Sequence, residues 1–347
     1  MASVDKSSFF SRKIVFLNAF ATILIVLIHS ETPLRFGQEL TFESFPFIFC
    51  VLQLAAVAVP LFYFISALLF YRNCEWKDLP HKLYRRIFTL LIPYLLWNLF
   101  FVLLYFTIRN IPFLGSRMNM VHSLETGKDW LLAIWHCRFT PLWFIKYLIF
   151  FNLLSPAIML LIKNKWIGLC SVVGLVIAGY FLGWSSVSLE YNAAIYVAGA
   201  LTGKHLYAPG KNDLTPVLCA KLRWALVPMA IVFVILYVSG MKSYGALFLF
   251  KFFAPIIIWF AVDLAIPVSL GSKWKVRPWM GYTFFIYATH QFLLNVEQAL
   301  ARSFLPGTPI VLNLTFIITP VVTILVLVLV AKYFSKTRLY SVLTGGR

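Results

Sequence analysis

Residues 14–30 read IVFLNAFATILIVLIHS, and this stretch decides the class of the protein. It is apolar apart from Asn18, Thr22 and its final two residues, and its length approaches the roughly 20 residues with which a helix crosses a membrane. His29 lies at its end. A titratable imidazole inside a span is costly unless it faces a cavity or a pathway. The stretch therefore predicts a membrane helix that carries a candidate functional residue.

The whole chain shares this apolar character. Of its 347 residues, 61% are hydrophobic and 12% are charged, whereas a soluble domain is about half apolar and a quarter charged. A soluble core cannot absorb such an excess, so the composition predicts an all-α, polytopic membrane helical bundle. Because no other stretch is long enough for a soluble domain, residues 1–347 are expected to form a single domain.

Apolar runs predict about ten transmembrane helices. The first run ends in polar residues rather than at a small-residue cleavage site, so we expect it to stay attached. The long segment 109–140 is expected to form an interfacial helix or a lid. The ten runs are 14–30, 46–71, 87–108, 141–162, 166–183, 190–203, 225–240, 245–267, 279–298 and 312–332.

The net charge of +18 indicates how the bundle is oriented. Basic residues are spread between the apolar runs rather than gathered on one face, which argues against nucleic acid as a partner. With the N-terminus inside, the inner segments hold about three times as many Lys and Arg residues as the outer ones, as the positive-inside rule describes. Both termini are therefore expected to be cytoplasmic, in a bacterial-type cytoplasmic membrane.

Cysteine usage predicts neither a disulfide framework nor a metal site. The cysteines are odd in number and scattered, with no pair at metal-ligand spacing. We expect reduced, structural thiols at Cys50, Cys74, Cys137, Cys170 and Cys219.

Four ionisable residues on four different spans lie at middle-to-outer depth, because a helix rises about 1.5 Å per residue. They are His29, Lys146, Lys251 and His290. An isolated charge at that depth is unfavourable, so one polar chamber open toward the outside is the economical interpretation. In the alternative, each lysine snorkels to the outer interface as an anchor, and His29 is a core histidine that bonds a neighbouring carbonyl.

The inner face carries a different signal. Lys82, Arg85 and Arg86 precede the third span. They fit anchoring beside anionic lipid, which composition alone favours. They also fit a seat for a cytosolic ligand that bears phosphates, because Arg matches phosphate oxygens in a bidentate way.

Five strings in the chain resemble the acyltransferase 3 family of integral-membrane acyltransferases. The resemblance covers about residues 10–335, and the expected ten spans agree with it. It depends on the ordered set, since a single apolar run matches by chance. The strings are FLNAFATILIVLIHS, VPLFYFISALLFYRN, YRRIFTLLIPYLLW, PLWFIKYLIFFNLLSP and FFIYATHQFLL.

These relatives O-acylate surface polysaccharides, peptidoglycan, lipid-linked sugars and some small molecules. The resemblance implies a cytosolic acyl-CoA donor, usually acetyl-CoA, and a carbohydrate or lipid-linked sugar acceptor at the membrane. Some relatives carry an extracytoplasmic hydrolase-like domain, so a separate extracytoplasmic transferase is a further expected partner. The family's motifs map onto the essential His29, the basic Arg85 and Arg86, the Leu142-Trp143-Phe144 motif and the late His290.

The chain departs from the family pattern at two places. Many members carry Arg or Lys eleven residues before the first histidine, whereas this chain has Asn18. Eleven residues make about three helical turns, so Asn18 and His29 share a face. Either another residue supplies the missing charge, with Lys13 as the nearest candidate, or this chain belongs to a branch of the family with another substrate. The family's Ser-Gly in the second span is Ser66-Ala67 here, which bears little on the chemistry.

Acyl transfer requires a base for the attacking hydroxyl and a donor to the developing oxyanion. His29 is the expected base or, alternatively, a transient acyl carrier. Lys146 and His290 are expected to orient the acceptor or polarise the carbonyl. Substrate-binding roles are expected for Trp143, Asn18 and Lys251, although Trp143 also fits an interfacial aromatic belt.

The donor site is expected on the inner face. Arg85, Arg86 and Lys82 would hold the phosphates of the acyl-CoA, while His29 lies toward the outside. The pantetheine arm, roughly 15–20 Å long if treated as an extended chain, would thread the bundle.

Two other classes of function remain open on sequence grounds. Intramembrane lysines and an outer chamber also suit a transporter or a flippase for a lipid-linked sugar. That class predicts internal repeats or paired broken helices, and the sequence shows neither. A structural or assembly subunit is the third class, and it does not require two intramembrane histidines.

Overall fold

The computed structural model describes residues 6–111, 124–182, 189–207, 244–265 and 275–346, together with 228, 231–232 and 235–236. Within these residues the chain is helical apart from turns and short connections, and it contains no strand. This confirms the predicted all-α class. Most of the expected span at 225–240 lies outside the described residues. Residues 112–123 of the expected segment 109–140 do so as well.

The helices of the first third form three long runs. The first is α1 (Lys6–Ile28) with α2 (Thr32–Arg35), and the second is α3 (Pro46–Ala55) with α4 (Ala58–Tyr71). The third begins with η1 (Trp76–Asp78) and continues through α5 (Leu79–Arg86), a π-helical turn η2 (Ile87–Leu91) and α6 (Ile92–Arg109).

The remaining described helices complete the bundle. They are α8 (Gly127–Trp135), α9 (Trp143–Leu153), α10 (Ser155–Lys163), α11 (Lys165–Phe181), α12 (Leu189–Leu201), the π-helical η3 (Thr202–Leu206), α15 (Tyr244–Ala265), η5 (Pro278–Tyr282), α16 (Thr283–Phe304), α17 (Pro309–Phe334) and α18 (Arg338–Thr344).

Five helical runs among the described residues are long and apolar enough to cross a membrane, and α9 with α10, bent by 63°, makes a sixth if counted as one span. The chain is therefore a multi-pass membrane protein. The expected count of ten is not confirmed. The five runs are Phe10–Arg35, Pro46–Tyr71, Trp76–Arg109, Tyr244–Val262 and Pro309–Phe334.

Three of the expected spans correspond to described helices that are either too short or too polar to be counted among the five runs. The runs 166–183 and 190–203 become α11 and α12, which have 17 and 13 residues among those described, at and below the short end of the range for a crossing. The run 279–298 becomes α16, which is long enough but carries polar residues such as His290 and Glu297 along its length. Which side each terminus faces stays a prediction.

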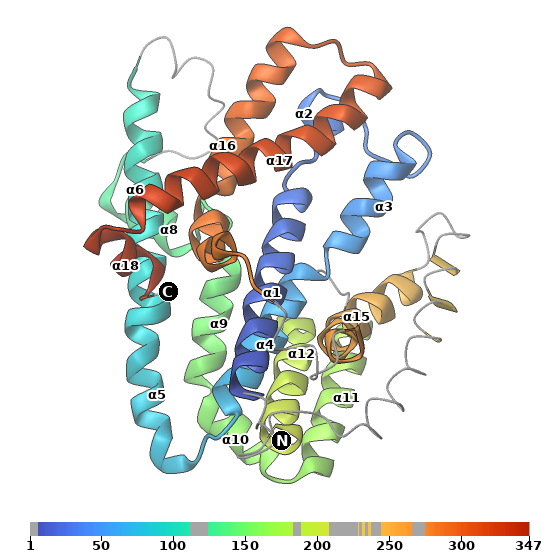
Figure 1. Cartoon of the computed structure of the whole chain (residues 1–347), viewed down its shortest axis with the longest axis vertical. Helices are drawn as coiled ribbons and strands as arrows, with labels where there is room; N and C mark the ends of the chain where they lie inside the picture. The colour runs from blue at the N-terminus through green and yellow to red at the C-terminus, as the bar shows by residue number, and fades with distance from the viewer. Residues whose placement is uncertain are drawn as a thin grey trace.

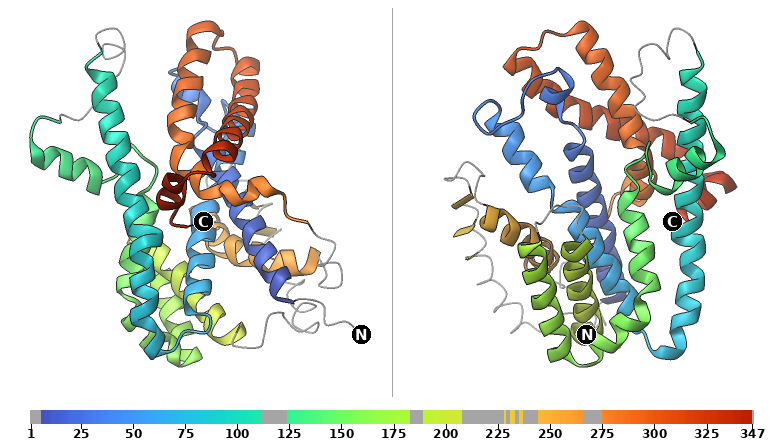
Figure 2. Two further views of the ribbon diagram at one scale, coloured as in Figure 1. Left: turned by 60° about the vertical axis from the view of Figure 1, so that its left-hand side comes forward. Right: turned by 180° about the vertical axis from the view of Figure 1, so that it is seen from behind.

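Helix α1 runs through the middle of the molecule (Figure 1) and packs against α3, α4, α16 and α17. Helix α4 packs against α1 and also against α12, and α11 packs in turn against α12. Helix α8, within the segment expected as a lid, packs outside α6 and projects from the bundle (Figure 2). His29, His290 and Trp143 lie where α1, α4, α9 and α16 converge.

Two glycines permit the close approach of α12 and its π-helical extension to α4. A Cβ at Gly199 would overlap the carbonyl oxygen of Phe64, and one at Gly203 would overlap that of Leu68. Small residues four apart allow membrane helices to pack backbone against backbone. The position of α4 therefore depends on this pair.

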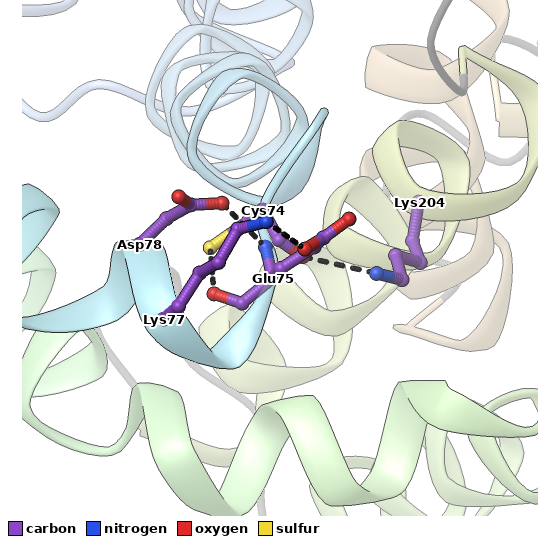
Figure 3. A network of polar contacts seen from close by, with 5 residues as sticks. All are labelled: Cys74, Glu75, Lys77, Asp78 and Lys204. Atoms are coloured by element: carbon purple, nitrogen blue, oxygen red, sulfur yellow. Dashed lines mark hydrogen bonds and ion pairs between the residues drawn. The ribbon is translucent and has the colours of Figure 1, made fainter.

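The inner end of α4 is held by a polar turn (Figure 3). The Lys82 ammonium donates to the carbonyls of Phe70 and Arg72, at 2.6 and 3.3 Å. Lys204 donates to the carbonyl of Cys74 at 2.9 Å. Carbonyls at a helix C-terminus have no partner within the helix and carry partial negative charge, so Lys82 stabilises the end of α4, while Lys204 holds the turn that follows it.

Candidate active site

Two histidines from opposite ends of the sequence face one another. His29 follows the last residue of α1 and is half-buried, whereas His290 lies on α16 and is completely buried. Their ring centroids are 5.1 Å apart, with the ring planes tilted by 46°. The packing of α1 against α16 brings the two rings together, although His290 itself borders neither of the cavities described below.

The hydrogen bonds of His290 define its tautomer. Its Nδ1 lies 2.8 Å from the carbonyl oxygen of Tyr287 and 3.3 Å from that of Ile286. Carbonyl oxygens only accept, so Nδ1 carries the hydrogen and Nε2 of the neutral ring has a free lone pair. Among the described residues this buried Nε2 has no hydrogen-bond partner. It is available as an acceptor beside His29.

His29 borders a cavity of about 210 Å³. It is called the outer cavity, and the next one the inner cavity, after the orientation predicted from the sequence. Trp143 and Tyr287 border the same space, and the remaining lining is apolar. The lining residues are Ile25, Ile28, His29, Ala56, Val59, Pro141, Trp143 and Tyr287.

An inner cavity of about 250 Å³ lies along the same helices. Tyr287 is the residue that borders both cavities. On α1, the inner cavity is bordered by Asn18 and Thr22 and the outer one by Ile25 and Ile28. Helix α4 and the start of α9 likewise contribute to both, so the two cavities follow one another along the bundle.

Arg86 is the cationic residue that lines the inner cavity. Its neighbour Arg85 is exposed and does not border it. Lys82 is bonded to carbonyls at the end of α4. Of the three basic residues expected to hold a donor, Arg86 is thus the one that borders this cavity.

Asn18 shares the inner cavity with Arg86. Lys13, expected as the nearest source of the charge that Asn18 lacks, does not border this cavity. Its ammonium lies 3.9 Å from the ring centroid of Trp259, and its side chain is buried. The positive charge beside Asn18 is that of Arg86, which comes from a different helix.

The two intramembrane lysines do not join the histidines. Lys146 borders neither cavity, and its ammonium lies 5.7 Å from the ring centroid of Tyr147. The Lys251 ammonium donates to Oε1 of Gln53 at 2.9 Å, on the side of α3 and α15. The expected single chamber that unites all four residues is therefore not found at these two cavities, because each lysine side chain has another environment. Their expected roles stay predictions.

Tyr287 and Pro141 are site residues that the sequence did not predict. Tyr287 lies in FFIYATHQFLL, three residues before His290 and thus one helical turn away, which was the signal available. Its phenol hydroxyl donates to the carbonyl of Pro141. This bond joins α16 to the segment before α9.

A family model described as an acyltransferase domain matches residues 14–332, nearly the whole chain. The chain belongs to this acyltransferase family. Comparisons with curated proteins and with solved structures found no match. The protein is a multi-pass membrane acyltransferase, and the paired histidines and their cavities lie within the matched residues.

Proposed function

We propose that this acyltransferase moves an acyl group, with acetyl the first candidate, from cytosolic acyl-CoA to a hydroxyl of a cell-envelope carbohydrate or lipid-linked sugar. The observation that carries the proposal is the His29–His290 pair at the outer end of two successive cavities, with Arg86 in the inner one. A transferable group and its acceptor can thus approach the imidazoles from opposite ends of the bundle.

The dimensions support a donor that enters from the Arg86 end. Asn18 and His29 are eleven residues apart on α1, about 16 Å along a helix. A pantetheine arm spans roughly 15–20 Å when extended. With its phosphates near Arg86, the acyl-CoA would therefore place its thioester near the histidines.

The imidazoles have distinct roles in this proposal. Neutral His290 has no hydrogen on Nε2, so it cannot polarise a carbonyl by donation. During the reaction its Nε2, which has no partner among the described residues, instead accepts the N–H of His29 and orients that ring. The other nitrogen of His29 is the base that takes the proton of the acceptor hydroxyl.

The reaction is a direct acyl transfer. The hydroxyl oxygen attacks the thioester carbon while His29 removes its proton. The C–S bond then breaks, and the departing thiolate of CoA takes up that proton from His29. Trp143, which borders the outer cavity, offers an indole face against which a sugar ring stacks.

The test is the turnover of labelled acetyl-CoA by the purified protein, both as transfer to added acceptor and as slow thioester hydrolysis without one. His29→Ala should lower the rate by about 10²–10⁴-fold, the usual contribution of a general base. His81→Ala, at an exposed histidine on α5, is the control and should retain the wild-type rate.

A folded His29→Ala protein with wild-type turnover would remove His29 from the mechanism. Tight binding of an unmodified sugar or lipid-linked sugar by the wild type, with no turnover of acyl-CoA, would instead favour a transporter.

A further inference from the structure

Tyr287 stands between the inner and the outer cavity. It is the one residue common to the two linings. Its ring is 4% exposed and packs against Phe144 and Phe62, with centroids 5.0 and 6.4 Å away. A group that moves from Arg86 toward His29 along these cavities has to pass this ring.

One hydrogen bond holds the side chain in this position, between the phenol hydroxyl and the carbonyl of Pro141. Pro141 itself borders the outer cavity. The bond from His290 goes to the backbone carbonyl of Tyr287 rather than to the phenol. The ring can therefore turn aside without releasing His290.

We propose that the Tyr287 ring is a partition that keeps the thioester apart from the outer cavity until an acceptor is bound. This inference rests on the acyl transfer proposed above. A hydroxyl of the acceptor donates to the Pro141 carbonyl in place of the phenol, and the ring moves out of the path. The chemical class of the acceptor follows, since it must present at least two hydroxyls, one for Pro141 and one for His29.

The partition prevents a wasteful side reaction. In that reaction a water oxygen attacks the thioester carbon, the C–S bond breaks, and the proton of the water passes to the thiolate, which yields the free acid and CoA. Excluding water from a reactive group is a general function of closing elements. Here the bond between the Tyr287 phenol and the Pro141 carbonyl keeps water from the thioester until an acceptor hydroxyl replaces the phenol.

Tyr287→Phe tests the proposal, because it removes the hydroxyl and keeps the ring. The ratio of acetyl-CoA hydrolysis to transfer should rise about fivefold, the factor that corresponds to loss of one neutral hydrogen bond. Tyr63→Phe is the matched control. It removes a buried phenol–carbonyl bond to Phe144 at 3.1 Å, in the same aromatic cluster, but Tyr63 borders neither cavity.

A second measurement is independent of catalysis. Ser66 borders the inner cavity, and Ser66→Cys can be labelled in intact cells by an impermeant thiol reagent applied from the His29 side. Labelling, corrected for the natural cysteines, should become several-fold faster when Tyr287→Phe is added. It should not change when Tyr63→Phe is added.

The two measurements separate the partition from the proposed function. Faster labelling in a protein that never turns over acyl-CoA supports the partition and rejects acyl transfer from that donor. An active enzyme in which Tyr287→Phe changes neither the labelling rate nor the hydrolysis ratio, relative to Tyr63→Phe, overturns the partition.

Discussion

At position 18 the chain has Asn where relatives often have Arg or Lys, and the structure places Asn18 in the same cavity as Arg86. A guanidinium retains its charge in nearly any environment and matches phosphate oxygens with paired hydrogen bonds. In the proposed reaction, Arg86 would supply the charge and the geometry that an anionic donor needs.

Arg86→Ala should raise the KM for acyl-CoA by about 10–100-fold, because hydrogen bonds between charged groups contribute about 1.5–3 kcal/mol each. The value of kcat should change less, since the histidines are untouched. Steady-state kinetics with acetyl-CoA measure both.

Arg85→Ala is the matched control for Arg86→Ala. It removes the same charge from the adjacent, exposed position. If both variants raise KM equally, the effect is one of surface charge, and the inner cavity is not the donor path.

At the scale of helices, the shape of the candidate site depends on a helix contact whose residues do not themselves border the site. The α12 segment presses Gly199 and Gly203 against the carbonyls of Phe64 and Leu68 on α4. Helix α4 in turn borders both cavities. The spacing of these glycines thus positions one wall of the candidate site.

Gly199→Ala should destabilise the protein by about 1–3 kcal/mol, the usual consequence of an overpacked core contact, because backbone atoms on both sides must move. Thermal unfolding in detergent measures the effect. Gly203→Ala should behave alike.

Gly174→Ala on α11 is the comparison, since a Cβ there meets no atom within 4 Å. It should leave stability unchanged or raise it slightly, as alanine favours helix. Equal melting temperatures for Gly199→Ala and Gly174→Ala would contradict the close helix contact.

For the whole molecule, the distribution of Lys and Arg predicts an orientation in the membrane with the C-terminus on the cytoplasmic side. The C-terminal helix α18 is tied to the third long run, where the Trp97 indole donates to the carbonyl of Leu343 at 2.9 Å. The chain end thus has a defined place beside α6 (Figure 1).

A reporter fused after Arg347 should be cytoplasmic, with a fluorescent protein bright and alkaline phosphatase inactive. Fusions truncated after Ile111, just beyond the third run, should give the opposite pattern. An active phosphatase at Arg347 would refute the cytoplasmic placement of the C-terminus.

The sequence by itself determined the membrane class and the all-α fold, and it made His29 the strongest candidate, with His290 beside it and with Lys82, Arg85 and Arg86 as one undivided basic group. These follow from composition and from local position along a run. An excess of apolar residues admits few architectures, and an imidazole within such a run stands out. The number of spans did not follow, because an apolar run does not show where a helix bends or ends. Helices α9 and α10 bend by 63° within the run 141–162, and the runs 166–183 and 190–203 form helices of 17 and 13 described residues.

Only the tertiary structure decided which side chains meet. It joined His29 to His290, turned Lys251 toward Gln53, and placed Tyr287 between the cavities. The physical reason is that these helices are apolar on most faces, so hydrophobic periodicity does not separate the side that faces lipid from the side that faces protein. The inward face of each helix is set by its neighbours, and those contacts join distant parts of the chain.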